Sequence, residues 1–129
     1  MTAAFLEHVN VTVSDPRKVA DLLVDLFGWR IRWQGEGKGG GLSIHVGNEN
    51  SYVVAYSQGG QMKAPDRYRT PGGLNHIGVV VEDLDAVEAK VKAAGYTPFN
   101  HADYEPGRRF YFDGPDNIEI EVVSYMRAG

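Results

Sequence analysis

The sequence predicts an α+β fold built from two consecutive modules, each with the element order βαβββ. Three observations support this prediction: a stretch near the N-terminus recurs in the middle of the chain, a helical pattern follows each copy, and three strand-like stretches follow each helix. One module alone would leave a sheet face exposed. The two sheets are therefore expected to pair into a concave cleft with the helices outside.

The repeat is visible when LEHVNVTVSDP, residues 6–16, is placed over LNHIGVVVEDL, residues 74–84. Leu, His, two Val and Asp recur in the same register, and the two identical histidines are His8 and His76. In the first copy polar and apolar residues alternate, which is typical of a half-buried strand. Each copy is therefore expected to begin its module as a strand.

A helix is expected after each of these strands. Apolar residues between Val19 and Phe27 follow the spacing of one helix face, and those between Leu84 and Ala94 repeat the pattern. Asp15 and Asp83 stand at the N-cap position, where an aspartate side chain accepts a hydrogen bond from the first helical turn. A glycine ends each pattern, as is common at helix C-termini.

Three strand-like stretches complete each module. They read WRIRWQG, GLSIHVG and SYVVAYS in the first half, and YTPFNHA, RRFYFDG and NIEIEVVSY in the second. The polar stretch between the halves, QGGQMKAPDRYRTPGG, is rich in Gly and Pro and is expected to be a linker. We therefore expect one domain over residues 1–129, with module one at about 5–58, the linker at about 59–73 and module two at about 74–126.

Composition excludes several classes of function. The net charge of −4 gives no electrostatic basis for nucleic-acid binding, and no apolar run approaches the ~20 residues of a membrane span. The absence of cysteine excludes disulfides, thiolate metal sites and cysteine nucleophiles, and it favours a cytoplasmic location. A metal ion would need His, Asp or Glu ligands, and a small molecule is the expected partner.

The alternation of side chains along a strand predicts which sheet face the polar residues occupy. Neighbours in a strand point to opposite faces, so His8, His76, Glu119 and Glu121 are expected on the sheet faces away from the helices. Two imidazoles and one carboxylate form a 2-His-1-carboxylate site with open coordination positions. Such residues are also typical of ordinary polar surface. The equivalent positions of the two histidines favour the metal site.

These stretches resemble the vicinal oxygen chelate superfamily of glyoxalases, bleomycin-resistance proteins and extradiol dioxygenases. EHVNVTVSDP, NHIGVVVEDL and the closing FYFDGPDNIEIEVVSY carry the resemblance, which covers nearly the whole chain. It implies that His8, His76 and Glu121 bind a divalent metal ion (Fe, Mn, Ni or Zn), with Glu119 as the alternative carboxylate. It also implies a homodimer, in which His8 of one chain meets the other two ligands of its partner.

The resemblance further implies a fourth ligand position on the last strand of module one. Placing VGNENSYVVAYS over FDGPDNIEIEVV puts Ala55 opposite Glu121. Because an alanine side chain neither binds a metal nor acts as a base, we do not expect glyoxalase I activity. A three-ligand site instead resembles the extradiol dioxygenases and the Mn-dependent fosfomycin-modifying members. There the metal chelates two adjacent substrate oxygens.

Such an enzyme also needs a catalytic acid or base. Tyr111 and His101 are the leading candidates, with Tyr104 and His45 as further possibilities. The stretch HADYEPGRRFYF concentrates three of these residues, and Arg109 within it is a candidate for binding an anionic group.

The alternative is a metal-free binding protein of the bleomycin-resistance type. An aromatic cleft would then matter more than the histidines, and its candidate residues are Trp29, Trp33, Tyr52, Tyr56 and Tyr111. A purely structural relative is a third reading. We favour the enzyme because all three metal ligands are present.

Overall fold

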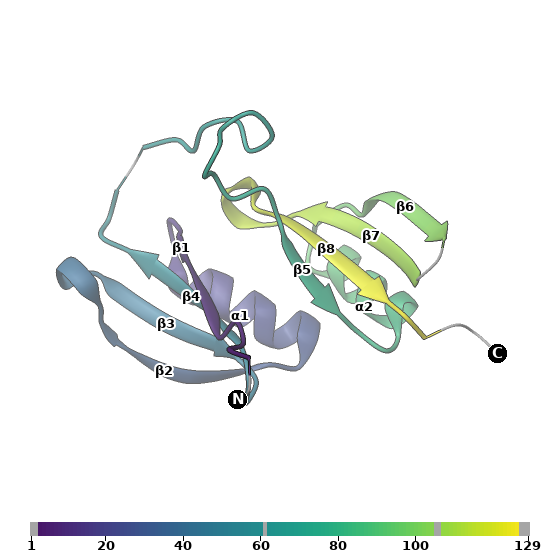
Figure 1. The fold of residues 1–129 in the computed structure, drawn as a ribbon, viewed down its shortest axis with the longest axis horizontal. Helices are drawn as coiled ribbons and strands as arrows, with labels where there is room; N and C mark the ends of the chain where they lie inside the picture. The colour runs from purple at the N-terminus through teal and green to yellow at the C-terminus, as the bar shows by residue number, and fades with distance from the viewer. Residues whose placement is uncertain (1–2, 61, 105–106, 127–129) are drawn as a thin grey trace. The chain divides into compact units, whose positions relative to one another are not determined.

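The computed structural model describes residues 3–60, 62–104 and 107–126. The chain divides into two compact units, Met1–Gln61 and Met62–Gly129, so that the boundary falls in the predicted linker. Within the described residues, each unit contains one four-stranded sheet and one α-helix (Figure 1).

The first unit follows the element order βαβββ. Its elements are β1 (His8–Thr12), α1 (Pro16–Phe27), β2 (Arg30–Glu36), β3 (Leu42–Gly47) and β4 (Tyr52–Ser57), with a short 3-10 turn, η1 (Lys38–Gly40), between β2 and β3. The strand order in the sheet is β1-β4-β3-β2, with β1 parallel to β4 and the other pairs antiparallel.

Local sequence explains where α1 begins and ends. The Asp15 carboxylate accepts a hydrogen bond from the Lys18 amide at 3.2 Å, which satisfies one free N–H of the first turn. Gly28 closes the helix in the left-handed conformation, at a φ of 70°, where a side chain would be strained. The apolar face of α1 then packs on one face of the sheet. The core contains Leu23, Leu26, Ile44, Val46 and Ala55.

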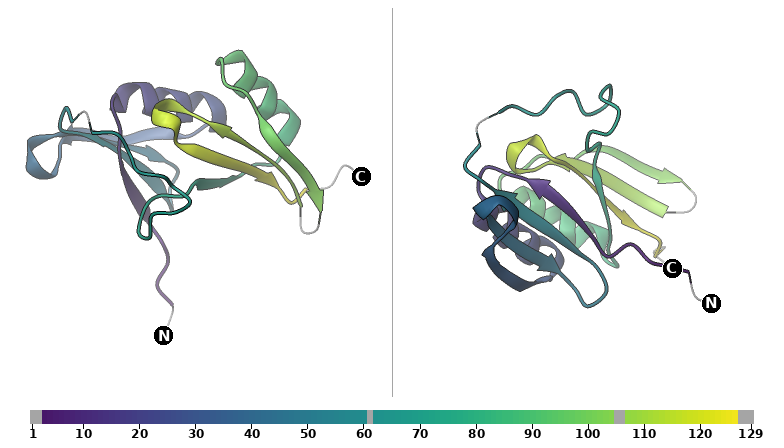
Figure 2. Two further views of the ribbon diagram at one scale, coloured as in Figure 1. Left: turned by 90° about the horizontal axis from the view of Figure 1, so that it is seen from above. Right: turned by 60° about the vertical axis from the view of Figure 1, so that its left-hand side comes forward.

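The second unit repeats this arrangement. Its elements are β5 (Ile77–Val80), α2 (Leu84–Ala93), β6 (Phe99–Tyr104), β7 (Gly107–Asp113), the 3-10 turn η2 (Pro115–Asn117) and β8 (Glu119–Ser124). The strand order β5-β8-β7-β6 matches that of the first unit, again with a parallel edge pair, β5 and β8. Asp83 caps α2 through the Ala86 amide at 3.0 Å. In each unit the helix covers one face of its own sheet (Figure 2).

The predicted α+β fold of two tandem βαβββ modules is confirmed. None of the helices in the described ranges is long and apolar enough to cross a membrane.

Two of the described strands depart from simple alternation: β2, whose pairing with β3 shifts between Ile31 and Trp33, and β6. In β6 the pairing with β7 shifts between Phe99 and Ala102, and Asn100 has a φ of 52°. This bulge inserts one residue, so the side chains beyond it change face. With strict alternation from Phe99, His101 would share the face of Tyr111. The bulge turns His101 to the side of α2.

Candidate metal centre

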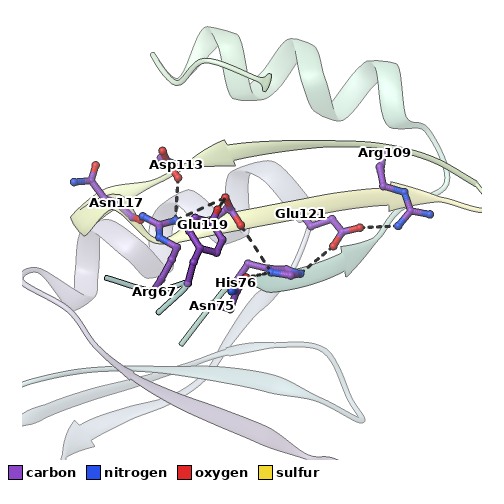
Figure 3. Close-up of polar contacts among 9 residues, drawn as sticks. Arg67, Asn75, His76, Arg109, Asp113, Asn117, Glu119 and Glu121 are labelled. Atoms are coloured by element: carbon purple, nitrogen blue, oxygen red, sulfur yellow. Dashed lines mark hydrogen bonds and ion pairs between the residues drawn. The ribbon is translucent and has the colours of Figure 1, made fainter. Parts of the chain in front are cut away.

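Two carboxylates of β8 and one histidine gather on the sheet face away from α2. Glu119 and Glu121 lie two residues apart on β8, and Gly78 of the neighbouring β5 pairs with Glu121. His76 immediately precedes β5. Its Nε2 lies 3.0 Å from Glu121 Oε1, and its Nδ1 lies 3.8 Å from Glu119 Oε2 (Figure 3). The imidazole thus lies between the two carboxylates.

The imidazole of His76 is oriented by the residue before it. Nδ1 lies 2.6 Å from the side-chain oxygen of Asn75. Because an amide oxygen only accepts hydrogen bonds, Nδ1 is the donor in this contact. Histidine ligands of metals usually donate their second ring N–H to an oxygen in this way, which fixes the ring and directs the other nitrogen to the metal.

Glu121 is held on its other side by an arginine. Its side chain is 13% exposed, and its Oε2 accepts a hydrogen bond from Arg109 Nη1 at 2.9 Å. The guanidinium of Arg109 lies over the Tyr104 ring, 4.7 Å from its centroid, a cation–π contact. Arg109 Nε is buried and has no hydrogen-bond partner within the described part of the chain.

Tyr111 belongs to the same cluster. It pairs with Glu121 across β7 and β8, and its ring meets His76 edge-on at 6.0 Å between centroids. Burial raises the pKa of the Tyr111 phenol, and the charge of Glu121 adds to the effect, because both disfavour the phenolate. Tyr111 therefore remains protonated near neutral pH.

The structure separates His101 from this cluster. His101 Nε2 lies 2.7 Å from Glu88 Oε2 of α2, and its ring stacks on Phe110 at 5.9 Å between centroids. Phe110 is fully buried. The predicted acid–base residue therefore lies on the helix side of the sheet, because of the bulge at Asn100.

His8 stands at the start of β1 in the first unit. Its Nδ1 lies 2.8 Å from Glu7 Oε1, and its ring stacks on Tyr52 at 4.9 Å between centroids. His45 also stacks on Tyr52 at 4.9 Å, and Trp33 lies 5.0 Å from His45. We call these four residues the ring row. It crosses all four strands of the sheet on the face away from α1.

The ring row predicts a pH-dependent stability. Burial, and then the nearby charges of His8 and Arg32, lower the pKa of His45 below its usual 6.5. In the unfolded chain the His45 imidazole binds a proton as pH falls through about 6.5, whereas in the folded protein it binds one only at lower pH. The free energy of unfolding therefore decreases between these two pKa values as pH falls. Urea unfolding at pH 7.0 and 5.5 should show a smaller loss of stability for His45→Gln than for the wild type.

A matched control for this prediction is His101→Gln, whose imidazole lies in the other unit. This variant should keep the pH dependence that His45 contributes. Equal losses of stability in the wild type and His45→Gln would contradict the prediction.

Comparisons with known proteins identify the family. The protein-family model described as Glyoxalase/Bleomycin resistance protein/Dioxygenase superfamily matches residues 5–122 of the sequence. The chain belongs to this superfamily. Among curated protein sequences no match was found.

Solved structures of the superfamily share the fold at low sequence identity. A glyoxylase/bleomycin resistance protein/dioxygenase domain from Frankia sp. EAN1pec is 23% identical, with a TM-score of 0.79, covering 95% of this chain and 98% of that one. The fosfomycin resistance protein FosX from Listeria monocytogenes, solved with Mn(II) and sulfate, is 16% identical, with a TM-score of 0.70 and coverages of 96% and 93%. TnmS3, an antibiotic-binding protein from Streptomyces sp. CB03234, is 19% identical, with a TM-score of 0.70 and coverages of 96% and 98%.

The strand register corrects one expectation about the superfamily's fourth ligand position. Asn10 pairs with Val54 in the first sheet, and the equivalent Gly78 pairs with Glu121 in the second. The counterpart of Glu121 is therefore Val54, not Ala55, which is fully buried on the helix side. The sequence overlay of the two hairpins is displaced by one residue, because the turn over residues 114–118 is one residue longer than the turn over residues 48–51. Valine, like alanine, supplies no carboxylate.

The cluster in the second unit fits two positions of a metal site. Two ligands at right angles, each ~2.1 Å from a metal ion, lie about 3.0 Å apart. His76 Nε2 and Glu121 Oε1 are 3.0 Å apart, which also suits a direct ion pair. Among the residues that the structure describes, no group of three or more His, Asp or Glu side chains is arranged to hold a metal ion. The pair therefore requires at least one further ligand.

Proposed function

We propose that this protein is a divalent-metal-dependent enzyme that chelates two adjacent oxygens of a small substrate, with His8, His76 and Glu121 as ligands. The observation that supports it most is the pair of His76 Nε2 and Glu121 Oε1 at 3.0 Å, with each side chain oriented by a further residue. His8 of the first unit is the third ligand, supplied within a homodimer as the superfamily resemblance implies. The chemistry is extradiol-dioxygenase-like, or a related lyase or transferase reaction.

The surrounding residues have distinct roles in this proposal. A bound divalent ion supplies Lewis acidity and a template for the two substrate oxygens. Asn75 fixes the ring of His76, and Arg109 offsets the charge of the Glu121 oxygen that faces away from the imidazole. Tyr111, protonated near neutral pH, donates a hydrogen bond or a proton to a substrate oxygen.

The donor set narrows the choice of metal. Imidazole and carboxylate ligands suit Fe, Mn, Ni or Zn, whereas the absence of cysteine removes the softest ligands. The structure of FosX with Mn(II) supports a metal of this kind. The glyoxalase I reaction is not part of the proposal, because Val54 stands where a fourth carboxylate is needed. A cytoplasmic location fits the cysteine-free sequence.

Metal titration tests the proposal. Purified protein is titrated with Fe(II), Mn(II), Ni(II) and Zn(II), and the titrations are repeated with His8→Ala and Glu121→Ala. The wild type should bind a divalent ion, and each substitution should weaken that binding, because each removes one ligand. Divalent-ion binding that is as strong in both variants as in the wild type would contradict the proposal. Sedimentation as a monomer at micromolar concentration would contradict the homodimer.

The ring row favours a second function, metal-free binding of a small molecule. Trp33 is 49% exposed, and its indole lies so close to Gly35 that a Cβ there would meet Trp33 Cζ2 at 2.8 Å. The indole thus lies along the strand with an open face, and the likeness to TnmS3 supports a binding role. Ligand binding that persists in EDTA and is lost in Trp33→Leu would favour this function over the enzyme.

A further inference from the structure

The two carboxylates of the candidate metal centre have different partners. Glu121 faces His76 Nε2 and Arg109. Glu119 is the more buried of the two, with its side chain 6% exposed, and it accepts a hydrogen bond from the hydroxyl of Tyr68. Arg67 Nη1 lies 4.0 Å from Glu119 Oε1. Both new partners come from the segment between β4 and β5.

This segment is fixed to the end of the β7–β8 hairpin. Arg67 Nη1 donates to Asp113 Oδ1 at 3.1 Å, and Arg67 Nη2 donates to the backbone oxygen of Asn117 (Figure 3). The Tyr68 amide donates to Asp66 Oδ1 at 2.9 Å. These contacts hold the Tyr68 hydroxyl and the Arg67 guanidinium beside Glu119, where a buried carboxylate needs partners for its charge.

The arrangement leaves one carboxylate for each nitrogen of His76. Glu119 faces Nδ1, the nitrogen that donates to Asn75, whereas Glu121 faces Nε2. A glutamate two residues away on the same strand face is the natural competitor for a metal at Nε2. The two alternatives, which strand parity alone leaves equal, are separated by their partners.

We propose that Tyr68 and Arg67 are positioning residues that hold Glu119 beside Nδ1 of His76 and thereby leave Glu121 as the metal-binding carboxylate. This inference rests on the proposed metal site. In it, Glu119 acts through the imidazole: it stabilises the orientation in which Nε2 is directed away from Asn75. Outer partners of this kind typically change metal affinity by about 10- to 100-fold when they are removed.

Mn(II) titration followed by electron paramagnetic resonance of the free ion tests the inference. Tyr68→Phe removes the hydroxyl from a side chain that is 65% exposed, so the core is untouched. We expect Mn(II) affinity to fall by about 10-fold, and similarly for Glu119→Gln. Tyr125→Phe, an exposed tyrosine at the end of the same unit, is the matched control and should bind Mn(II) as the wild type does.

A second pair of variants tests Arg67. Arg67→Gln should weaken Mn(II) binding, because it releases Glu119 and the contact to Asp113. The control is Arg69→Gln, because the Arg69 side chain is 89% exposed and its ion-pair partner is Asp66. Circular dichroism of each variant confirms that it is folded.

A double substitution separates positioning from a general structural effect. If Tyr68 holds Glu119 away from the metal, its removal frees Glu119 as a substitute ligand. Glu121→Gln should then lower Mn(II) affinity less in the Tyr68→Phe background than in the wild type. The visible spectrum of the Co(II)-substituted protein should also change in Tyr68→Phe, whereas a purely structural role would leave it unchanged.

The outcomes distinguish this inference from the proposed function. A wild type that binds none of Fe(II), Mn(II), Ni(II) and Zn(II) overturns both, and if another of these ions binds in place of Mn(II), the same variants are titrated with that ion. A wild type that binds Mn(II) through Glu121, with Tyr68→Phe and Glu119→Gln unchanged in affinity and the double substitution additive, overturns the inference alone.

Discussion

Replacing His76 with glutamine should lower the affinity for Mn(II) by at least about 100-fold, because loss of a ligand costs more than loss of an outer partner, which already costs about 10- to 100-fold. The substitution removes the imidazole nitrogen that lies 3.0 Å from Glu121 Oε1. It also leaves Glu121 with Arg109 as its remaining ion-pair partner in the cluster, which favours a closed ion pair over metal binding. Isothermal titration calorimetry measures the change.

His101→Gln is the matched control for this experiment. Both histidines belong to the second unit, but His101 pairs with Glu88 on the helix side of the sheet. The control should bind Mn(II) within about 2-fold of the wild type, because outer-partner effects require contact with a ligand. Equal losses in the two variants would show that the imidazoles act only on stability. An unchanged affinity in His76→Gln would remove His76 from the ligand set.

Replacing Phe110 with alanine should lower the free energy of unfolding by about 3–5 kcal/mol, the usual cost of deleting a buried phenylalanine side chain. Phe110 is fully buried on the helix side of β7 and pairs with Val122, which is also fully buried. Its ring additionally supports His101. This decrease combines the lost free energy of burying the ring and the cost of the cavity that its removal leaves. Urea unfolding measures this decrease, and the slope of the free energy of unfolding against urea concentration should stay unchanged.

Phe5→Ala provides the control, because Phe5 is 73% exposed. Its substitution should change stability by less than about 0.5 kcal/mol, as is usual for surface sites. A loss below about 1 kcal/mol in Phe110→Ala would contradict the assignment of Phe110 to the core of the second unit.

The repetition in the sequence was sufficient to predict the fold. Asp15 and Asp83 cap the two helices as expected, because capping depends on a contact within one turn. Alternation in residues 8–12 placed His8 at the start of β1, and the matching copy placed His76 immediately before β5. Local chemistry determines these features, so they can be read along the chain.

Two features that the sequence did not reveal depend on irregular backbone. The bulge at Asn100 reversed the parity of β6 and moved His101 to the side of α2. One additional residue in the β7–β8 turn shifted the counterpart of Glu121 from Ala55 to Val54. A pattern of alternating residues contains no signal for an inserted residue until the strands are paired.

The partners of Glu119 could not be predicted for a different reason. Arg67 and Tyr68 lie about fifty positions before Glu119, in a stretch whose composition indicated only a linker. The contact depends on how that stretch folds back on the β7–β8 hairpin. Strand parity alone therefore left Glu119 and Glu121 equivalent, and their different partners became visible only in the structure.

Anomalous diffraction at the zinc absorption edge, on crystals grown with Zn(II), tests the central claim most directly. The account predicts one strong peak per chain within ~2.0–2.2 Å of a nitrogen of His8, Nε2 of His76 and an oxygen of Glu121. Glu119 should remain bound to Tyr68. A zinc ion coordinated elsewhere, or one that engages Glu119 in place of Glu121, would contradict it.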